Sequence, residues 1–132
     1  MTKTNQKVKP TRKKPFSANR ASVKSLEAEG WTVGVVEQRI PHCFITRDLF
    51  GFADLIAISP SRGIMAVQVT GGGNGPARVK KTRLEPRSAI WLASGGRIQV
   101  HDWRKRAKQT QRECVVVEIT KQGDPEERHW EE

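Results

Sequence analysis

The sequence is poor in cysteine and contains no long apolar run, and each deficit excludes broad classes of protein. Cys43 and Cys114 are the only cysteines among 132 residues, and they lack the close pairing typical of zinc ribbons and disulfide scaffolds. No stretch approaches the roughly 18 consecutive apolar residues of a transmembrane helix. The first residues also lack the apolar segment of a secretory signal. We therefore expect a soluble intracellular protein that does not enter a membrane.

Acidic residues are absent from the first 26 positions, which hold eight basic ones. The chain as a whole has 24 Lys and Arg against 14 Asp and Glu, a net charge of +10. The basic N-terminal segment cannot bury enough apolar surface to offset the entropy that it would lose on becoming ordered. We interpret residues 1–17 as a basic arm without fixed structure, with a merely solubilising tail as the alternative. Residues 18–122 then form one domain, and residues 123–132 an acidic C-terminal tail.

A second basic zone spans residues 78–112, where eleven basic side chains face only Glu85 and Asp102 as acids. A solvated helix face usually mixes the two signs, so this imbalance favours a surface that binds phosphates. The expected partner is DNA. The candidate nucleic-acid-binding residues are Arg78, Lys80, Lys81, Arg83, Arg104, Lys105 and Arg106.

Apolar and turn-forming residues alternate along the rest of the chain in a pattern typical of an α/β (α+β) domain. The pattern predicts a helix, three strands, a second helix and two strands, forming a mixed sheet flanked by helices. Residues 39–49 are turn-rich, and Pro41 is expected to interrupt strand pairing there. The expected elements are a helix over 19–28, strands over 31–38, 50–58 and 64–70, a helix over 76–93 that breaks near Pro86, and strands over 97–103 and 114–120.

Two polar side chains interrupt neighbouring apolar strands: Asp54 in the second strand and Gln68 in the third. An ionised carboxylate in a buried strand is costly unless it is paired or binds a metal. Asp54 and the Gln68 side-chain carbonyl, with the Val69 backbone carbonyl beside them, could bind a hard cation such as Mg²⁺. Thr70 lies on the same face as Gln68. A structural role is the alternative, in which Asp54 caps a hairpin edge and Gln68 bonds a loop.

Asp54, followed after a hairpin by Gln68-Val69-Thr70 at the end of a buried strand, resembles the PD-(D/E)XK nuclease superfamily. The resemblance implies a restriction-endonuclease-like αβββαβ core over about residues 19–120. It also implies phosphodiester hydrolysis that depends on Mg²⁺ or Mn²⁺. Members include Holliday-junction resolvases and small phage or bacterial endonucleases. The implied location is the cytoplasm of a bacterium or of a phage-infected host cell.

The sequence departs from the superfamily pattern at two positions. Ala53 replaces the leading proline, and Thr70 stands where a lysine is usual. The lysine is expected to steady the attacking water or the charge that develops on phosphorus, so Lys80, Lys81 or Arg78 would have to replace it. Gln68 in place of an acid removes a charge from the metal site. Glu37 is the best candidate for the missing carboxylate, and Glu27 and Glu29, which more often would form a solvated helix face, are the alternatives.

The resulting hypothesis is a metal-dependent DNA endonuclease, with branched or junction DNA as one substrate class. Junction resolution would require a two-fold dimer that presents two sites. The main alternative is a DNA-binding protein that keeps a degenerate nuclease fold without activity, and a ribosome-associated basic protein is a third. The candidate catalytic residues are Asp54, Gln68, Glu37, Thr70 and Lys80, and the candidate metal ligands are Asp54, Gln68, Val69 and Glu37.

Overall fold

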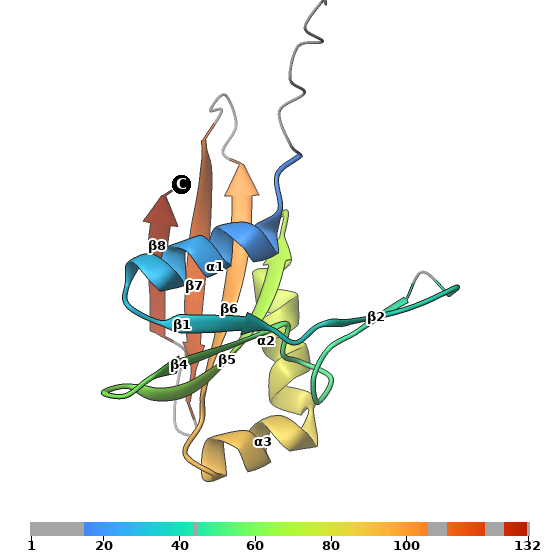
Figure 1. Cartoon of the computed structure of the whole chain (residues 1–132), viewed down its shortest axis with the longest axis vertical. Coiled ribbons are helices and arrows are strands. Elements are labelled where there is room, and N and C mark those ends of the chain that lie inside the picture. Colours follow the sequence, from blue (N-terminus) through green and yellow to red (C-terminus); the bar gives the residue numbers. More distant parts are fainter. Residues whose placement is uncertain (1–14, 44, 106–110, 121–125, 132) are drawn as a thin grey trace, which may run out of the picture.

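A six-stranded mixed sheet with helices on both faces forms the body of the protein (Figure 1). The structure is a computed structural model and describes residues 15–43, 45–105, 111–120 and 126–131. Its elements are α1 (Ala18–Ala28), β1 (Thr32–Val35), β2 (Gln38–Ile40), β3 (Ile45–Arg47), β4 (Leu55–Ser59), β5 (Gly63–Gly71), α2 (Gly75–Leu84), α3 (Pro86–Ala93), β6 (Arg97–Lys105), β7 (Arg112–Ile119) and β8 (Glu126–Glu131).

The strand order in the sheet is β1-β4-β5-β6-β7-β8. Every neighbouring pair is antiparallel except β5 and β6, which run parallel. A parallel pair needs a crossover, and α2 and α3 supply it. The succession α1, β1, β4, β5, α2–α3, β6 confirms the predicted mixed α+β class and the αβββαβ order of its core.

The two faces of the sheet bury different parts of the chain. On one face α1 places Leu26 against Leu55 and Met65. On the other, α2 and α3 cover the cluster around Ala66 and Ile98. Side chains alternate between the faces along each strand, so β5, which is covered on both sides, is buried from residue 65 to 68. The site described below lies where both layers meet β4 and β5.

A buried chain of hydrogen bonds fixes α1 to the sheet. Ser22 Oγ accepts from the Trp103 indole N–H and contacts His101 Nδ1, both at 2.8 Å. His101 Nε2 is 2.9 Å from Gln99 Oε1, whose amide nitrogen donates to Glu118. Because Gln99 uses its nitrogen on Glu118, its oxygen accepts from His101, and Ser22 donates to Nδ1. These hydrogen bonds connect α1 to β6 and β7 through buried side chains.

Two predicted segments are wrong, both beside Asp54. Residues 50–54 do not extend the second strand, because Phe50 and Gly51 have positive φ angles of 55° and 78°. A tight loop results, closed by mutual hydrogen bonds between Leu49 and Ala53. Residues 38–47 contain strands β2 and β3 rather than turns alone. Pro41 lies in the turn between them, where no inter-strand N–H is required.

The helical segment breaks at Glu85, between α2 and α3, as the proline at 86 predicts. Residues 126–131, set apart above as a tail, pair with β7 as strand β8, so the sheet extends beyond residue 122. Most of the basic arm, residues 1–14, lies outside the described residues. None of the helices in the described part of the chain is long and apolar enough to cross a membrane.

Candidate metal centre

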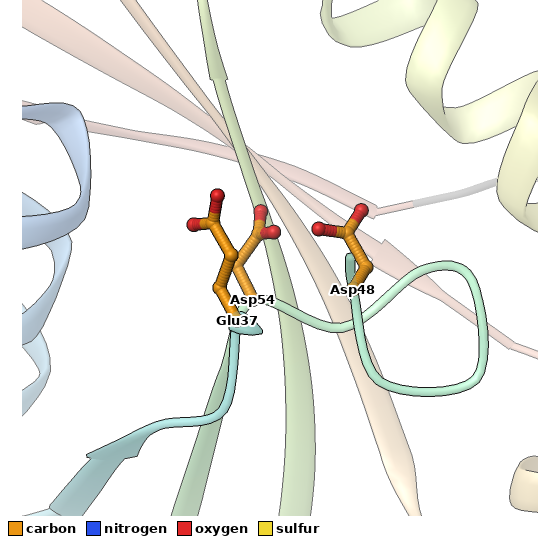
Figure 2. Close-up of side chains that lie close together, drawn as sticks. All are labelled: Glu37, Asp48 and Asp54. Atoms are coloured by element: carbon orange, nitrogen blue, oxygen red, sulfur yellow. The ribbon is translucent and has the colours of Figure 1, made fainter. Parts of the chain in front are cut away.

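Three carboxylates from separate parts of the chain converge at the edge of the sheet (Figure 2). Glu37 follows β1, Asp48 follows β3, and Asp54 immediately precedes β4. Each offers an oxygen, and these oxygens all lie within 4.8 Å of one another. Crowded carboxylates repel one another, so a proton or a nearby cation would stabilise the arrangement.

Asp54 is held in place by the neighbouring strand β5. Its backbone N–H donates to Val67 O at 2.8 Å. Its Oδ2 accepts from Gln68 Nε2 at 2.9 Å and from the Val69 N–H at 2.7 Å. The residue is 4% exposed. Two donors therefore bind the same oxygen, Oδ2. This bonding fixes the Asp54 carboxyl group in its position beside Asp48 and Glu37.

The surroundings of Asp54 disfavour its ionised form. Burial, a hydrogen bond with the Asp48 side chain and the negative charges of Asp48 and Glu37 together raise the pKa of Asp54 from 3.8 to about 8, and burial contributes most. The Val69 N–H opposes them. A pKa of about 8 favours the protonated form of Asp54 in the metal-free protein near neutral pH. A divalent cation would supply the missing positive charge instead.

Glu37 is fixed by its backbone and by α1. The N–H groups of Val36 and Glu37 donate to Asp54 O at 2.9 and 3.1 Å. Asn19 Nδ2 donates to Glu37 Oε2 at 2.9 Å. Ser17 caps α1, since its side chain accepts from the Arg20 N–H. The Asn19 side chain is thus left to orient Glu37 from the first turn of the helix.

Asp48 is the member of the cluster that the sequence-based prediction missed. The loop closed by Leu49 and Ala53 turns the chain back so that Asp48 faces Asp54 (Figure 2). Gly51 makes the turn possible: its φ is +78°, and a Cβ there would lie 2.8 Å from Glu85 Oε1. The glycine between two acids six positions apart is the signal that could have indicated this fold-back.

Basic side chains surround the carboxylates in one cavity of about 730 Å³. Asp54 is its buried acid, whereas Arg47, Lys81 and Arg87 are exposed and Arg78 is half-buried. The cavity is lined by Asn19, Glu37, Thr46, Arg47, Asp48, Gly51, Asp54, Gln68, Val69, Arg78, Lys81 and Arg87. The carboxylate oxygens suit a divalent cation bound in the cavity. The basic side chains around them suit an anionic substrate.

The structure brings together Glu37, Asp54, Gln68 and Val69 as the sequence predicts, but presents two of them differently. Gln68 offers Asp54 its amide nitrogen, and Val69 its N–H, where carbonyl oxygens were expected. Through these N–H groups, Gln68 and Val69 both orient the Asp54 carboxyl group. The Gln68 N–H can donate to Asp54 Oδ2 whether or not the carboxyl group carries a proton.

The predicted basic residues divide into two groups. Arg78 and Lys81 line the cavity, whereas Lys80 does not. Thr70, the remaining candidate catalytic residue, is half-buried and does not line the cavity either. Arg83, Arg104 and Lys105 do not line the cavity: Arg83 and Lys105 are exposed, and Arg104 donates to Asp102 at 3.0 Å. Arg106 lies outside the described residues.

No protein-family model and no curated protein sequence matches the chain. Among solved structures, it is similar to Hjc, a Holliday junction resolvase from the archaeal hyperthermophile Archaeoglobus fulgidus. The TM-score is 0.45 and the sequence identity 14%, over 87% of this chain and 81% of that one. Similarity at this level assigns no residue a role.

Proposed function

We propose that the protein is a DNA endonuclease that depends on Mg²⁺ or Mn²⁺. The observation that carries the proposal is the cluster of three carboxylates, one of them buried, inside a cavity surrounded by basic side chains. A buried acid with a raised pKa beside specific charges, in a cleft, is typical of a functional site. Oxygen donors of this kind suit a hard divalent cation.

Asp54, Glu37 and Asp48 would hold the cation. Gln68 and the Val69 N–H keep Asp54 in position, and Asn19 does the same for Glu37. When bound, the ion lowers the pKa of a water molecule and neutralises charge on a phosphate oxygen. The three carboxylates come from three different segments, so ligation also ties those segments together.

Arg78 and Lys81 take the role left open by Thr70. Both line the same cavity as the carboxylates, one turn apart on α2. From there they would bind the phosphates beside the scissile bond and stabilise charge that develops in the transition state. Branched or junction DNA remains the proposed substrate class, and a two-fold dimer would be needed to cut a junction in both strands.

A second function, DNA binding without cleavage, is favoured by one observation. Thr70 supplies no charge where the superfamily usually has lysine, and Lys80, one of the proposed replacements, does not line the cavity. In that case the carboxylates would be kept for stability or for a structural ion.

Cleavage by the Asp54→Asn variant separates the two functions. Plasmid and branched DNA are incubated with Mg²⁺, Mn²⁺ or EDTA, and DNA binding is measured in parallel. We expect metal-dependent products from the natural protein, none from Asp54→Asn, and DNA binding by the variant that is equal or tighter. Glu27→Gln, an exposed acid on α1, is the control and should cleave normally. If the natural protein bound DNA but gave no product, or if Asp54→Asn cleaved at the normal rate, the nuclease proposal would be excluded.

A further inference from the structure

The β2–β3 hairpin stands between two of the three carboxylates. Glu37 is the residue before β2, and Asp48 is the residue after β3. The hairpin is described for residues 38–43 and 45–47. Any ion held by Glu37 and Asp48 therefore binds both ends of the hairpin at once.

The hairpin has little other support. It forms a two-stranded sheet of its own, separate from the six-stranded sheet, and projects away from the body (Figure 1). Ile40 is half-buried, and the other described residues of the hairpin are exposed. Isolated two-stranded hairpins are marginally stable in water. The position of this one is therefore set mainly by its two ends, where the N–H of Glu37 bonds Asp54 O.

The surface of the hairpin is basic and apolar. Residues 38–47 contain Arg39 and Arg47 and no acid. The pairing places Arg39 with Thr46 on one face and Arg47 with Gln38 on the other. Ile45 is 55% exposed. A two-stranded ribbon with cations on both faces suits contact with the two phosphate backbones that border a DNA groove.

We propose that the β2–β3 hairpin is a DNA-contacting arm whose position is fixed by the divalent cation bound at its two ends. The inference rests on the proposed function, because it takes the ligand of the carboxylates to be a divalent ion and the substrate to be DNA. Arg47 also lines the cavity, so DNA held along the hairpin continues to the carboxylates. Arg39 lies in the same ribbon without lining the cavity, and its role is limited to holding DNA.

The two binding events must then help each other. A cation that ties Glu37 to Asp48 reduces the freedom of the hairpin, so less entropy is lost when DNA orders it further. By linkage, DNA on the hairpin raises the affinity of the cation by the same factor. The substrate thereby helps to assemble the metal site that acts on it.

Cys43, which is exposed in the hairpin, allows a direct test because Cys114 is buried. A fluorophore on Cys43 reports the motion of the hairpin through its anisotropy. We expect the anisotropy to rise with Mn²⁺ and to rise further with uncleavable duplex or branched DNA. The control is a Cys43→Ser, Lys24→Cys protein labelled on α1, where Mn²⁺ should change nothing. An unchanged Cys43 signal, while Mn²⁺ binding is confirmed by calorimetry, would overturn the inference.

Arg39→Ala tests the DNA contact separately from the metal site. We expect DNA affinity to fall on the order of tenfold and the salt slope to drop by about one, with Mn²⁺ affinity unchanged. Arg39→Lys should restore most of the affinity, and Lys24→Ala on α1 is the control. Unchanged DNA affinity, or a change in self-association instead, would refute the arm. If the natural protein does not bind Mn²⁺ through Asp54, the proposed function itself fails, and calorimetry on Asp54→Asn detects that outcome.

Discussion

The buried environment of Asp54 favours the neutral form of its carboxyl group. Its burial, its hydrogen bond with Asp48 and the charges of Asp48 and Glu37 together raise its pKa to about 8. A protein does not gain stability from such a group above its unfolded pKa. The proposed divalent cation would offset this cost, because it matches both the charge and the donors.

Metal-free stability should fall as the pH rises through the range between the two pKa values of Asp54. The folded protein keeps the proton up to a pKa of about 8, whereas the unfolded chain releases it near 3.8. Unfolding therefore becomes more favourable with rising pH across that interval and levels off above it. Thermal melting in EDTA checks this by comparing the natural protein with Asp54→Asn. The variant should be the more stable of the two at alkaline pH, and the difference should shrink toward acid.

The same pKa predicts how cation affinity depends on pH. Below about pH 8 the cation must displace the proton of Asp54, so affinity should increase as the pH rises and proton release should accompany binding. Calorimetry in buffers of different ionisation enthalpy measures the protons released. A stability difference or a cation affinity that did not change with pH would show that Asp54 is already ionised.

Asn19 orients one of the three carboxylates from the first turn of α1. It donates to Glu37 from α1 at 2.9 Å, and residues that orient metal ligands typically contribute about tenfold or more to affinity. Asn19→Ala should weaken Mn²⁺ binding by that order and leave thermal stability in EDTA nearly unchanged. Lys24→Ala, which is exposed on the same helix, should do neither. Equal Mn²⁺ affinity in the two variants would mean that Glu37 needs no orientation.

At the scale of the elements, the glycine-rich link between β5 and α2 is fixed rather than open. The N–H groups of Gly73 and Gly75 donate to the two carboxylate oxygens of Asp102 at 3.2 and 2.9 Å. Asp102 lies on β6, is 1% exposed, and also bonds Arg104. The link therefore holds α2 in place relative to the sheet, and α2 carries Arg78 and Lys81 to the cavity.

Gly75→Ala should disturb this link. A Cβ at residue 75 would lie 2.8 Å from Asp102 Oδ2, and overpacking of this kind costs about 1–3 kcal/mol. Gly34→Ala is the matched control, because a Cβ at position 34 meets nothing within 4 Å. Denaturant unfolding should show a loss for the first variant and almost none for the second. If the two variants lose the same free energy of unfolding, the link accommodates the new methyl group through a shift of Asp102.

The elements also show which parts of the site a sequence can predict. Asp54 and Gln68 stand out because each interrupts an apolar run, and the order of helices and strands follows from local periodicity. Asp48 and Asn19 carry no such signal. Asp48 reaches the site through a fold-back at Gly51, and Asn19 through the docking of α1 onto the sheet. Gly51 between two acids is a local indication of the fold-back, whereas the docking of α1 is a contact between distant segments, which local patterns do not record.

For the whole molecule, the dominant property is charge. The net charge is +10, yet the candidate metal centre contains three acids. Positive charge attracts DNA over distances limited by screening, whereas the carboxylates act only at contact. In the proposed nuclease, DNA binding and cleavage are therefore assigned to different residues, and the two should respond differently to salt.

DNA affinity should fall steeply as salt rises, because each phosphate neutralised releases a counterion and adds about 0.9 to the slope of log affinity against log salt. Replacing Lys3, Lys7, Lys9, Arg12, Lys13 and Lys14 with glutamine should lower that slope. Cleavage of DNA bound at saturation should not change, because these residues supply no carboxylate to the site. Fluorescence anisotropy over a range of salt concentrations measures the slope, and single-turnover kinetics measures the cleavage. A slope that the replacements leave unchanged would assign the phosphate contacts to the zone of residues 78–112 and leave the N-terminal charges without a part in binding.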